Sequence, residues 1–234
     1  MVTKEEIKVP IIVAISAMPK AGKTHLSFTF PDPIAYFEFD INGATPILPK
    51  FPGKKIDVFK YPLPIIDSDP PKPYAIDLMA KFDKEYSEAV ESCKYKTVII
   101  DTTSMVWRVI GHAEAEALHQ KKILQVQYYR PNLRMNAIFT RAKLAGINMV
   151  AIQYLADVYL NGDRTGEVKS DGWSQTEAAV DVVLWNARVM KDAGKGKKAV
   201  SFETTIKANR FEPQADGMVL PNTNYEEVYT CLGL

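Results

Sequence analysis

The sequence predicts an α/β fold built on a doubly wound, mainly parallel β-sheet. Three observations indicate it: apolar, β-branched runs typical of strands buried on both faces, segments with helical spacing, and their alternation along the chain. Parallel strands need crossover connections, and these are right-handed in nearly all known sheets. Helices are therefore expected on both faces of the sheet.

Five segments have the composition of strands in this sheet. They are residues 9–16 (VPIIVAIS), 34–40 (IAYFEFD), 55–61 (KIDVFKY), 97–101 (TVIID) and 147–153 (INMVAIQ). A short helix is expected after residue 24, ended by Pro31 and Pro33. Longer helices are expected at residues 74–93, 104–118 and 133–144. Residues 63–73 (LPIIDSDPPKP) are rich in proline and predict a solvated connector.

The last third of the chain has a different pattern. Residues 154–173 carry turn signals at Asn161-Gly162 and predict a hairpin or a mobile loop. Residues 181–190 and 199–208 predict two strands joined by a basic turn, which gives a C-terminal antiparallel β extension. We expect one domain over residues 1–234, with a core at about 9–212 and no assignment for 213–234.

Composition excludes several classes of protein. There are 29 Lys and Arg against 28 Asp and Glu, 47% of residues are hydrophobic and 24% charged, as in ordinary globular chains. Two cysteines and three histidines, none at metal-ligand spacing, make a disulfide scaffold or a structural zinc site unexpected. Without a long apolar run or a leader-like start, the expectation is a cytoplasmic protein that makes no contact with membranes.

The loop after the first predicted strand carries the clearest motif, a Walker A sequence with alanine in its first position. The residues expected to bind nucleotide are Ala17, Met18, Pro19, Lys20, Ala21, Gly22, Lys23, Thr24 and His25. In such a loop, backbone N–H groups surround the phosphates, the lysine reaches the β and γ oxygens, and the hydroxyl binds Mg²⁺. The alternative is a surface turn that merely contains the letters GKT.

Asp101 ends the fourth predicted strand, where a P-loop protein needs a carboxylate for its magnesium ion. Thr24 and Asp101 are thus the candidate metal ligands, and ATP and Mg²⁺ the expected cofactors. Asp101 is also suited to cap the helix that follows, because DTTS is a good capping sequence. The two roles are compatible.

Taken in this order, the motifs resemble those of the RecA-type core ATPases, and more narrowly the short, phage-encoded Sak-type single-strand annealing proteins. The resemblance covers about residues 9–212 and implies a RecA-like P-loop NTPase fold. It implies that Gln153, after INMVAI, senses the γ-phosphate and signals to a DNA-binding loop at 154–173. Within IKANRF, it implies that Lys207 and Arg210 act in trans on the ATP of a neighbouring subunit.

The catalytic carboxylate departs from that family. The family places a glutamate two residues beyond an aspartate at the end of the second strand, where this chain has Asp40 and then Asn42. An amide cannot accept a proton from the attacking water. Either Glu38 or Asp40 takes the role, or ATP serves mainly as an assembly ligand.

A basic segment indicates where nucleic acid would bind. Residues 117–156 contain six lysines and arginines and no acidic residue. Cations interleaved with aromatic rings suit single-stranded DNA, which makes Lys121, Lys122, Tyr128, Tyr129 and Arg130 the first candidates. Arg164 and Lys169 form a second candidate surface, and the lysines at 195, 197 and 198 a third. The alternative in each case is a solvated surface.

Together these features predict an ATP-dependent, single-stranded-DNA-binding recombination protein that promotes annealing or strand exchange. The resemblance implies a DNA-dependent ATPase with nucleotide bound between the subunits of a ring or filament, in the host cytoplasm if the chain is phage-encoded. A single-stranded-DNA-binding protein is a further candidate partner. The alternatives are a P-loop small-molecule kinase, although no arginine-rich lid is visible, and a nucleotide-dependent adaptor that does not hydrolyse ATP.

Overall fold

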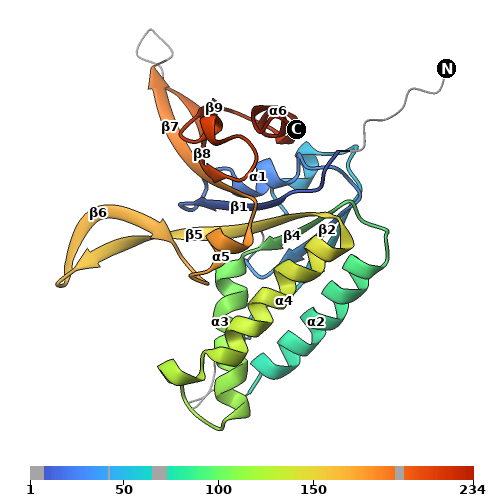
Figure 1. The fold of residues 1–234 in the computed structure, drawn as a ribbon, viewed down its shortest axis with the longest axis vertical. Coiled ribbons are helices and arrows are strands. Elements are labelled where there is room, and N and C mark those ends of the chain that lie inside the picture. The colour runs from blue at the N-terminus through green and yellow to red at the C-terminus, as the bar shows by residue number, and fades with distance from the viewer. Residues whose placement is uncertain (1–7, 42, 65–72, 193–197) are drawn as a thin grey trace.

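The computed structural model describes residues 8–41, 43–64, 73–192 and 198–234. Within them, eight strands follow the order β3-β2-β4-β5-β1-β7-β8-β9, and β6 pairs with the far part of β5 (Figure 1). The strands are β1 Ile12–Ala17, β2 Ile34–Glu38, β3 Ile56–Lys60, β4 Thr97–Asp101, β5 Asn148–Leu160, β6 Asp163–Ser170, β7 Val182–Asp192, β8 Lys198–Asn209 and β9 Val219–Pro221.

The strands from β3 to β7 in this order pair in parallel, whereas β7, β8 and β9 pair antiparallel. This arrangement confirms the predicted fold class, a mainly parallel sheet with a C-terminal antiparallel extension. All six side chains of β1 are buried, as expected for a strand with neighbours on both edges and layers on both faces.

Helices cover both faces of the sheet. The helices are α1 Lys23–Ser27, α2 Ala75–Glu91, α3 Thr103–Ala117, α4 Tyr129–Ala145, α5 Thr176–Ala179 and α6 Tyr225–Cys231, with 3₁₀ turns η1 Leu48–Lys50, η2 Gln125–Gln127 and η3 Pro213–Ala215. On one face α2, α3 and α4 lie side by side (Figure 1). On the other face α1, η1 and α6 pack against the sheet. Because successive strand residues point to opposite faces, Ile12 and Ala14 face the first layer, and Val13 and Ile15 the second.

Two predicted boundaries were wrong. β5 does not end at Gln153 but continues to Leu160, because its far part pairs with β6 in a hairpin that turns at Asn161 and Gly162. Both turn residues have left-handed backbones, with φ of 53° and 92°. Likewise α4 begins at Tyr129 rather than near residue 133, since Pro131 lies in its first turn, where a helix needs no N–H donor.

The last 22 residues, 213–234, had no predicted place. They add β9 to the edge of the sheet and cover its second face with α6, which buries Tyr225, Val228 and Tyr229. The Asn224 side chain caps α6 by accepting a hydrogen bond from the Glu227 amide at 3.1 Å. Across the described ranges, no helix has the length and apolar character needed to span a bilayer.

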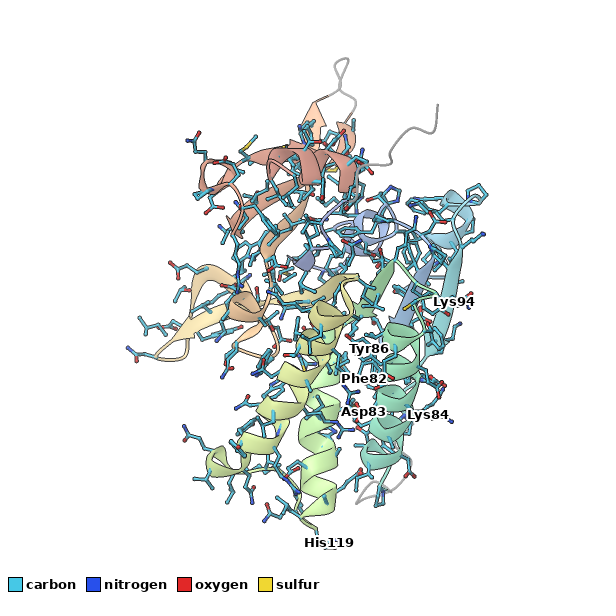
Figure 2. All side chains as sticks on the ribbon, turned by 45° about the vertical axis from the view of Figure 1, so that its right-hand side comes forward. Phe82, Asp83, Lys84, Tyr86, Lys94 and His119 are labelled. Atoms are coloured by element: carbon cyan, nitrogen blue, oxygen red, sulfur yellow. The ribbon has the colours of Figure 1, made fainter. Side chains whose placement is uncertain are left out.

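Aromatic rings fill the space between the sheet and α2. Phe82 and Tyr86, one turn apart on α2, stack with ring centroids 5.4 Å apart, and both rings contact Phe37 of β2 (Figure 2). The Tyr86 hydroxyl donates a hydrogen bond to the Ile138 carbonyl of α4 at 2.7 Å. This cluster joins two helices to the strand that leads to Glu38.

We predict that Phe82→Ala lowers the free energy of unfolding by about 3–5 kcal/mol, because the buried ring leaves a cavity that its neighbours cannot fill. Urea denaturation measures the difference. Lys84→Ala is the matched control, since Lys84 is exposed on the same helix and should change stability by less than about 0.5 kcal/mol. Equal losses in the two variants would contradict the packing described.

Candidate nucleotide-binding site

The loop between β1 and α1 has the backbone geometry of an anion-binding site. Lys20 and Gly22 adopt left-handed conformations, with φ of 63° and 84°, and Gly22 is the N-cap of α1. Alternating backbone hands next to a helix start turn successive N–H groups toward one point. Glycine is favoured at position 22 for two reasons. The backbone there has a positive φ, and a Cβ would lie 3.1 Å from the ring of Phe202 on β8.

Lys23 lies inside this loop. Its side chain is 8% exposed, and its ammonium donates hydrogen bonds to the carbonyls of Ala17 at 3.0 Å and Met18 at 3.3 Å. Burial lowers the pKa of Lys23, while the negative charges of Asp101 and Asp40 oppose that shift. The amine is thus held at the predicted phosphate position by groups of its own loop.

Asp101 lies beside Thr24 at the carboxyl end of β4. Its Oδ2 accepts hydrogen bonds from the hydroxyls of Thr24 at 2.9 Å and Tyr36 at 2.5 Å. Burial raises the pKa of this carboxyl group despite the two donors. The predicted alternative role, capping α3, belongs instead to Thr102, whose side chain accepts a hydrogen bond from the Met105 amide.

The residues around Asp101 fit a magnesium ion. A carboxylate and a hydroxyl are the oxygen ligands that Mg²⁺ takes when phosphates supply the others. A Cβ on residue 43 would lie 2.7 Å from the Tyr36 hydroxyl and 3.1 Å from Asp101 Oδ2, so only glycine allows the backbone this close. Gly43 therefore keeps space open beside the carboxylate.

The two candidate bases have different surroundings. Glu38 pairs with Asp101 across the β2–β4 register, is 4% exposed, and accepts a hydrogen bond from the Ala44 amide at 2.8 Å. Asp40 is only partly buried, and its amide donates to the Asp101 carbonyl at 3.0 Å. Its negative charge opposes the lowering of the pKa of Lys23 and contributes to the raised pKa of Tyr154. Asn42 lies outside the described residues.

Gln153 pairs with Ser16, the residue before the phosphate loop, but its side chain is on the opposite face of the sheet from Lys23. It is 1% exposed and accepts a hydrogen bond from the Ser16 hydroxyl at 3.3 Å, while its amide donates to Thr176 Oγ1 at 3.3 Å. Strand alternation places Tyr154 on the face of Lys23, and the sensor role of Gln153 stays a prediction. The Tyr154 ring centroid is 5.3 Å from Lys23 Nζ.

Tyr36 and Tyr154 are the site residues that sequence reasoning missed. The alternation of side chains along β2 and β5 was the available signal, because Tyr36 shares a face with Glu38, and Tyr154 follows Gln153. Burial and the nearby carboxylates raise the pKa of both phenols, so each is a hydroxyl donor at neutral pH.

The remaining loop residues divide into two groups. Met18, Pro19 and Lys20 are exposed, and a groove of about 370 Å³ runs from Met18, Pro19 and Ala21 to Trp185 on β7. His25 instead packs against Phe51, with ring centroids 4.9 Å apart, and burial lowers its pKa. His25 thus contacts the covering layer of the second face.

Lys207 lies over Trp185 of the groove that begins at the loop, whereas Arg210 lies away from the loop of its own chain. The ammonium of Lys207 is 4.5 Å from the ring centroid of Trp185. Arg210 donates to the Ala178 carbonyl at 2.5 Å and lies 3.9 Å from Asp181, which also accepts a hydrogen bond from the Ile12 amide. Arg210 is therefore at the opposite end of β1 from the loop, about 16 Å along the strand.

The candidate DNA-binding residues lie in two places. The segment from the end of α3 to the start of α4 forms the tip of the helical layer farthest from the sheet (Figure 1), and His119 marks it in Figure 2. We call the exposed residues Lys121, Lys122, Tyr128, Tyr129 and Arg130 the helical tip. Tyr129 is 71% exposed, whereas Tyr128 packs on Trp107 at 5.7 Å. Arg164 and Lys169 lie on the projecting β5–β6 hairpin, where Arg164 pairs with Asp157 at 2.5 Å.

The other basic residues of the 117–156 segment are engaged by neighbours. Arg134 pairs with Asp83 of α2, Arg141 donates to the Ser87 hydroxyl, and Lys143 lies 3.3 Å from Asp181. Of the three lysines in the third candidate surface, those at 195 and 197 lie outside the described residues, and Lys198 begins β8.

Comparison with known proteins supports the fold. The structure is similar to the crystal structure of a KaiC-like protein from the hyperthermophilic archaeon Pyrococcus horikoshii OT3, with a TM-score of 0.51 and 13% sequence identity over 91% of this chain and 85% of that one. No protein-family model and no curated protein matches the sequence. The fold is therefore RecA-like, and nucleotide binding and the narrower resemblance to the Sak-type proteins stay predictions.

We predict that Gly43→Ala weakens binding of Mg²⁺ and a fluorescent ATP analogue by roughly 10- to 100-fold, since displacing Asp101 and Tyr36 costs about 1–3 kcal/mol. Titration by fluorescence anisotropy measures the Kd. Gly53→Ala is the matched control, because a Cβ there meets no atom within 4 Å. Similar affinities for the two variants would contradict a magnesium site beside Gly43.

Proposed function

We propose that this protein is an ATP-dependent, single-stranded-DNA-binding recombination protein that hydrolyses ATP. The observation that carries the proposal is the convergence of Lys23 and Thr24 of the loop with Asp101, 77 positions later in the chain, on one point beside an anion-binding loop. A surface turn would have no reason to bury a lysine or to oppose it with a carboxylate.

Each residue of the loop has a distinct part in binding. Backbone N–H groups of residues 20–24 would hold the phosphates, and Lys23 would exchange the carbonyls of Ala17 and Met18 for the β and γ oxygens. Thr24 and Asp101 would hold Mg²⁺, which neutralises charge on the phosphates. Tyr36 keeps Asp101 Oδ2 in place through its hydrogen bond.

Asp40 is the better of the two candidate bases for the attacking water. Glu38 is buried and already accepts a backbone hydrogen bond from Ala44, with Lys60 3.8 Å away. Asp40 is only partly buried, and its negative charge opposes the lowering of the pKa of Lys23, so its carboxylate is the more accessible one for an attacking water.

We further propose that nucleotide binds between copies of the chain in a ring or filament. The distance of Arg210 from its own loop supports this, because a guanidinium at the far end of β1 can assist phosphoryl transfer only on another copy. Lys207, exposed near the end of β8 and three residues before Arg210, would reach the same neighbour.

The helical tip is the better supported DNA-binding surface. It combines the exposed lysines Lys121 and Lys122 with an exposed ring at Tyr129, which is the composition that holds a phosphate backbone and stacks bases, while Arg130 lies 3.9 Å from Glu114. On the hairpin, Lys169 is exposed, while Arg164 is already paired with Asp157. We therefore assign the first contact with DNA to the helical tip and a secondary contact to the hairpin.

Lys23→Ala is expected to weaken ATP binding about 100-fold, since charge-assisted hydrogen bonds to the phosphates worth about 3 kcal/mol are lost. Phosphate release, with and without single-stranded DNA, and nucleotide titration measure the effect. Wild-type protein should hydrolyse ATP faster with DNA, and Lys84→Ala should behave as wild type. Turnover that ignores DNA would favour the metabolite-kinase alternative, and ATP-dependent assembly without turnover the adaptor.

The double variant Lys121→Ala/Lys122→Ala is expected to reduce the slope of log affinity against log salt by about 1.4, because single strands release about 0.7 counterion per neutralised phosphate. Fluorescence anisotropy with a labelled oligonucleotide at several salt concentrations measures it. Tyr129→Ala should cost about 1–3 kcal/mol of binding free energy at every salt concentration.

The matched control for the helical tip is Lys55→Ala/Lys84→Ala, which removes two exposed lysines elsewhere on the surface. If both double variants change the salt slope equally, DNA is attracted by overall charge and the helical tip is not the site.

A further inference from the structure

Tyr154 lies at the junction between the parallel sheet and the β5–β6 hairpin. It forms the last pair of β5 with β1, opposite Ala17, and the next residue, Leu155, already pairs with Ser170 of β6. The strand is continuous through this point. Tyr154 is therefore a neighbour of both Ala17, the first residue of the phosphate loop, and the base of the hairpin.

The side chain of Tyr154 faces Lys23. The ammonium of Lys23 has three contacts: two carbonyls of its own loop and the face of the Tyr154 ring, whose centroid is 5.3 Å away. The ring is the contact that comes from outside the loop, and a cation over an aromatic face is attracted to it. When Lys23 turns toward phosphate oxygens, the ring loses its cation.

The backbone of Tyr154 holds the base of the hairpin together. Its carbonyl accepts a hydrogen bond from the Asp171 amide at 2.9 Å, which closes the hairpin on the return strand. Its amide is 3.1 Å from the hydroxyl of Ser104, and that hydroxyl donates to the Asp171 carbonyl at 2.6 Å. Gln153 also reaches the hairpin base, since its amide donates to the Asp171 carbonyl at 3.5 Å, but its other partners are Ser16 and Thr176 and it has no contact with Lys23 in the described structure.

We propose that Tyr154 is a positioning residue that links the phosphate loop to the β5–β6 hairpin: its ring, supported by Lys23, keeps the hairpin base closed until nucleotide draws Lys23 away. This inference rests on the proposed function, since it requires nucleotide at the loop. Nucleotide binding then loosens the hairpin that carries Arg164 and Lys169. Tyr154 carries the link because its ring, unlike the Gln153 side chain, contacts Lys23.

Limited trypsin digestion followed by mass spectrometry tests the link. Cleavage after Arg164 and Lys169 reports the hairpin, and cleavage after Lys84 on α2 is an internal reference for the rest of the fold. Each protein is digested with and without a saturating, non-hydrolysable ATP analogue and Mg²⁺, and analogue binding is measured separately. We expect the analogue to speed cleavage of the wild-type hairpin several-fold and to leave Lys84 unaffected.

Three variants separate the ring from the rest of the hairpin. Tyr154→Phe keeps the aromatic face and should respond as wild type. Tyr154→Leu removes it, so its hairpin should be cleaved rapidly without nucleotide and show no further response at saturation. Tyr159→Leu changes a tyrosine of the same hairpin that is 63% exposed, and it should respond as wild type.

The outcomes that overturn the proposal are distinct. Tyr154→Leu with the wild-type resting rate and response would exclude the link, and equal acceleration after Lys84 would make the effect a general loss of structure. Wild-type protein that binds the analogue with no change in hairpin cleavage would overturn this inference alone. Wild-type protein that does not bind the analogue would overturn the proposed function as well.

Discussion

The rest of the site depends on how one buried carboxylate, that of Asp101, is held. Its side chain accepts hydrogen bonds from Thr24 of α1 and Tyr36 of β2, and its backbone carbonyl accepts them from the amides of Phe39 and Asp40. One residue thus joins the helix after the phosphate loop to the end of β2. Burying a carboxylate costs free energy unless it is hydrogen-bonded. Separating α1 or β2 from β4, which carries Asp101, would leave this carboxylate with fewer hydrogen bonds.

Local sequence patterns predicted the elements that pack on both faces and missed those determined by distant partners. The strand at residues 97–101 was predicted to the residue, because a fully buried strand must be apolar along its whole length. The extension of β5 beyond Gln153 depends on pairing with β6, and the place of α6 on contacts with α1 and the sheet, neither of which is visible in a local window. Sequence reasoning did not identify Tyr36 and Tyr154 as site residues for the same reason. The role of Tyr154, for example, depends on its contact with Lys23, which is far away in the sequence.

Charge counted along the sequence overstated the charge free to bind DNA. The segment 117–156 holds six cations and no acid, but Asp83, Ser87 and Asp181, which belong to other elements, engage Arg134, Arg141 and Lys143. The tertiary structure divides one basic run into a structural half on α4 and an accessible half at its tip. A run of like charge in the sequence therefore indicates a candidate DNA-binding region, and the tertiary packing determines which of its charged side chains remain accessible to DNA.

The contact between Gly22 and Phe202 has a consequence for how the chain folds. The two residues are 180 positions apart, and Tyr229 likewise donates a hydrogen bond to the carbonyl of Val9 near the start of the first strand. A phosphate loop that needs β8 for its packing cannot reach its final shape while only the first half of the chain has emerged from the ribosome. Contacts of such long separation are slow to form, so the nucleotide site is completed late in folding, and nucleotide favours the fully assembled chain over its partly folded precursors.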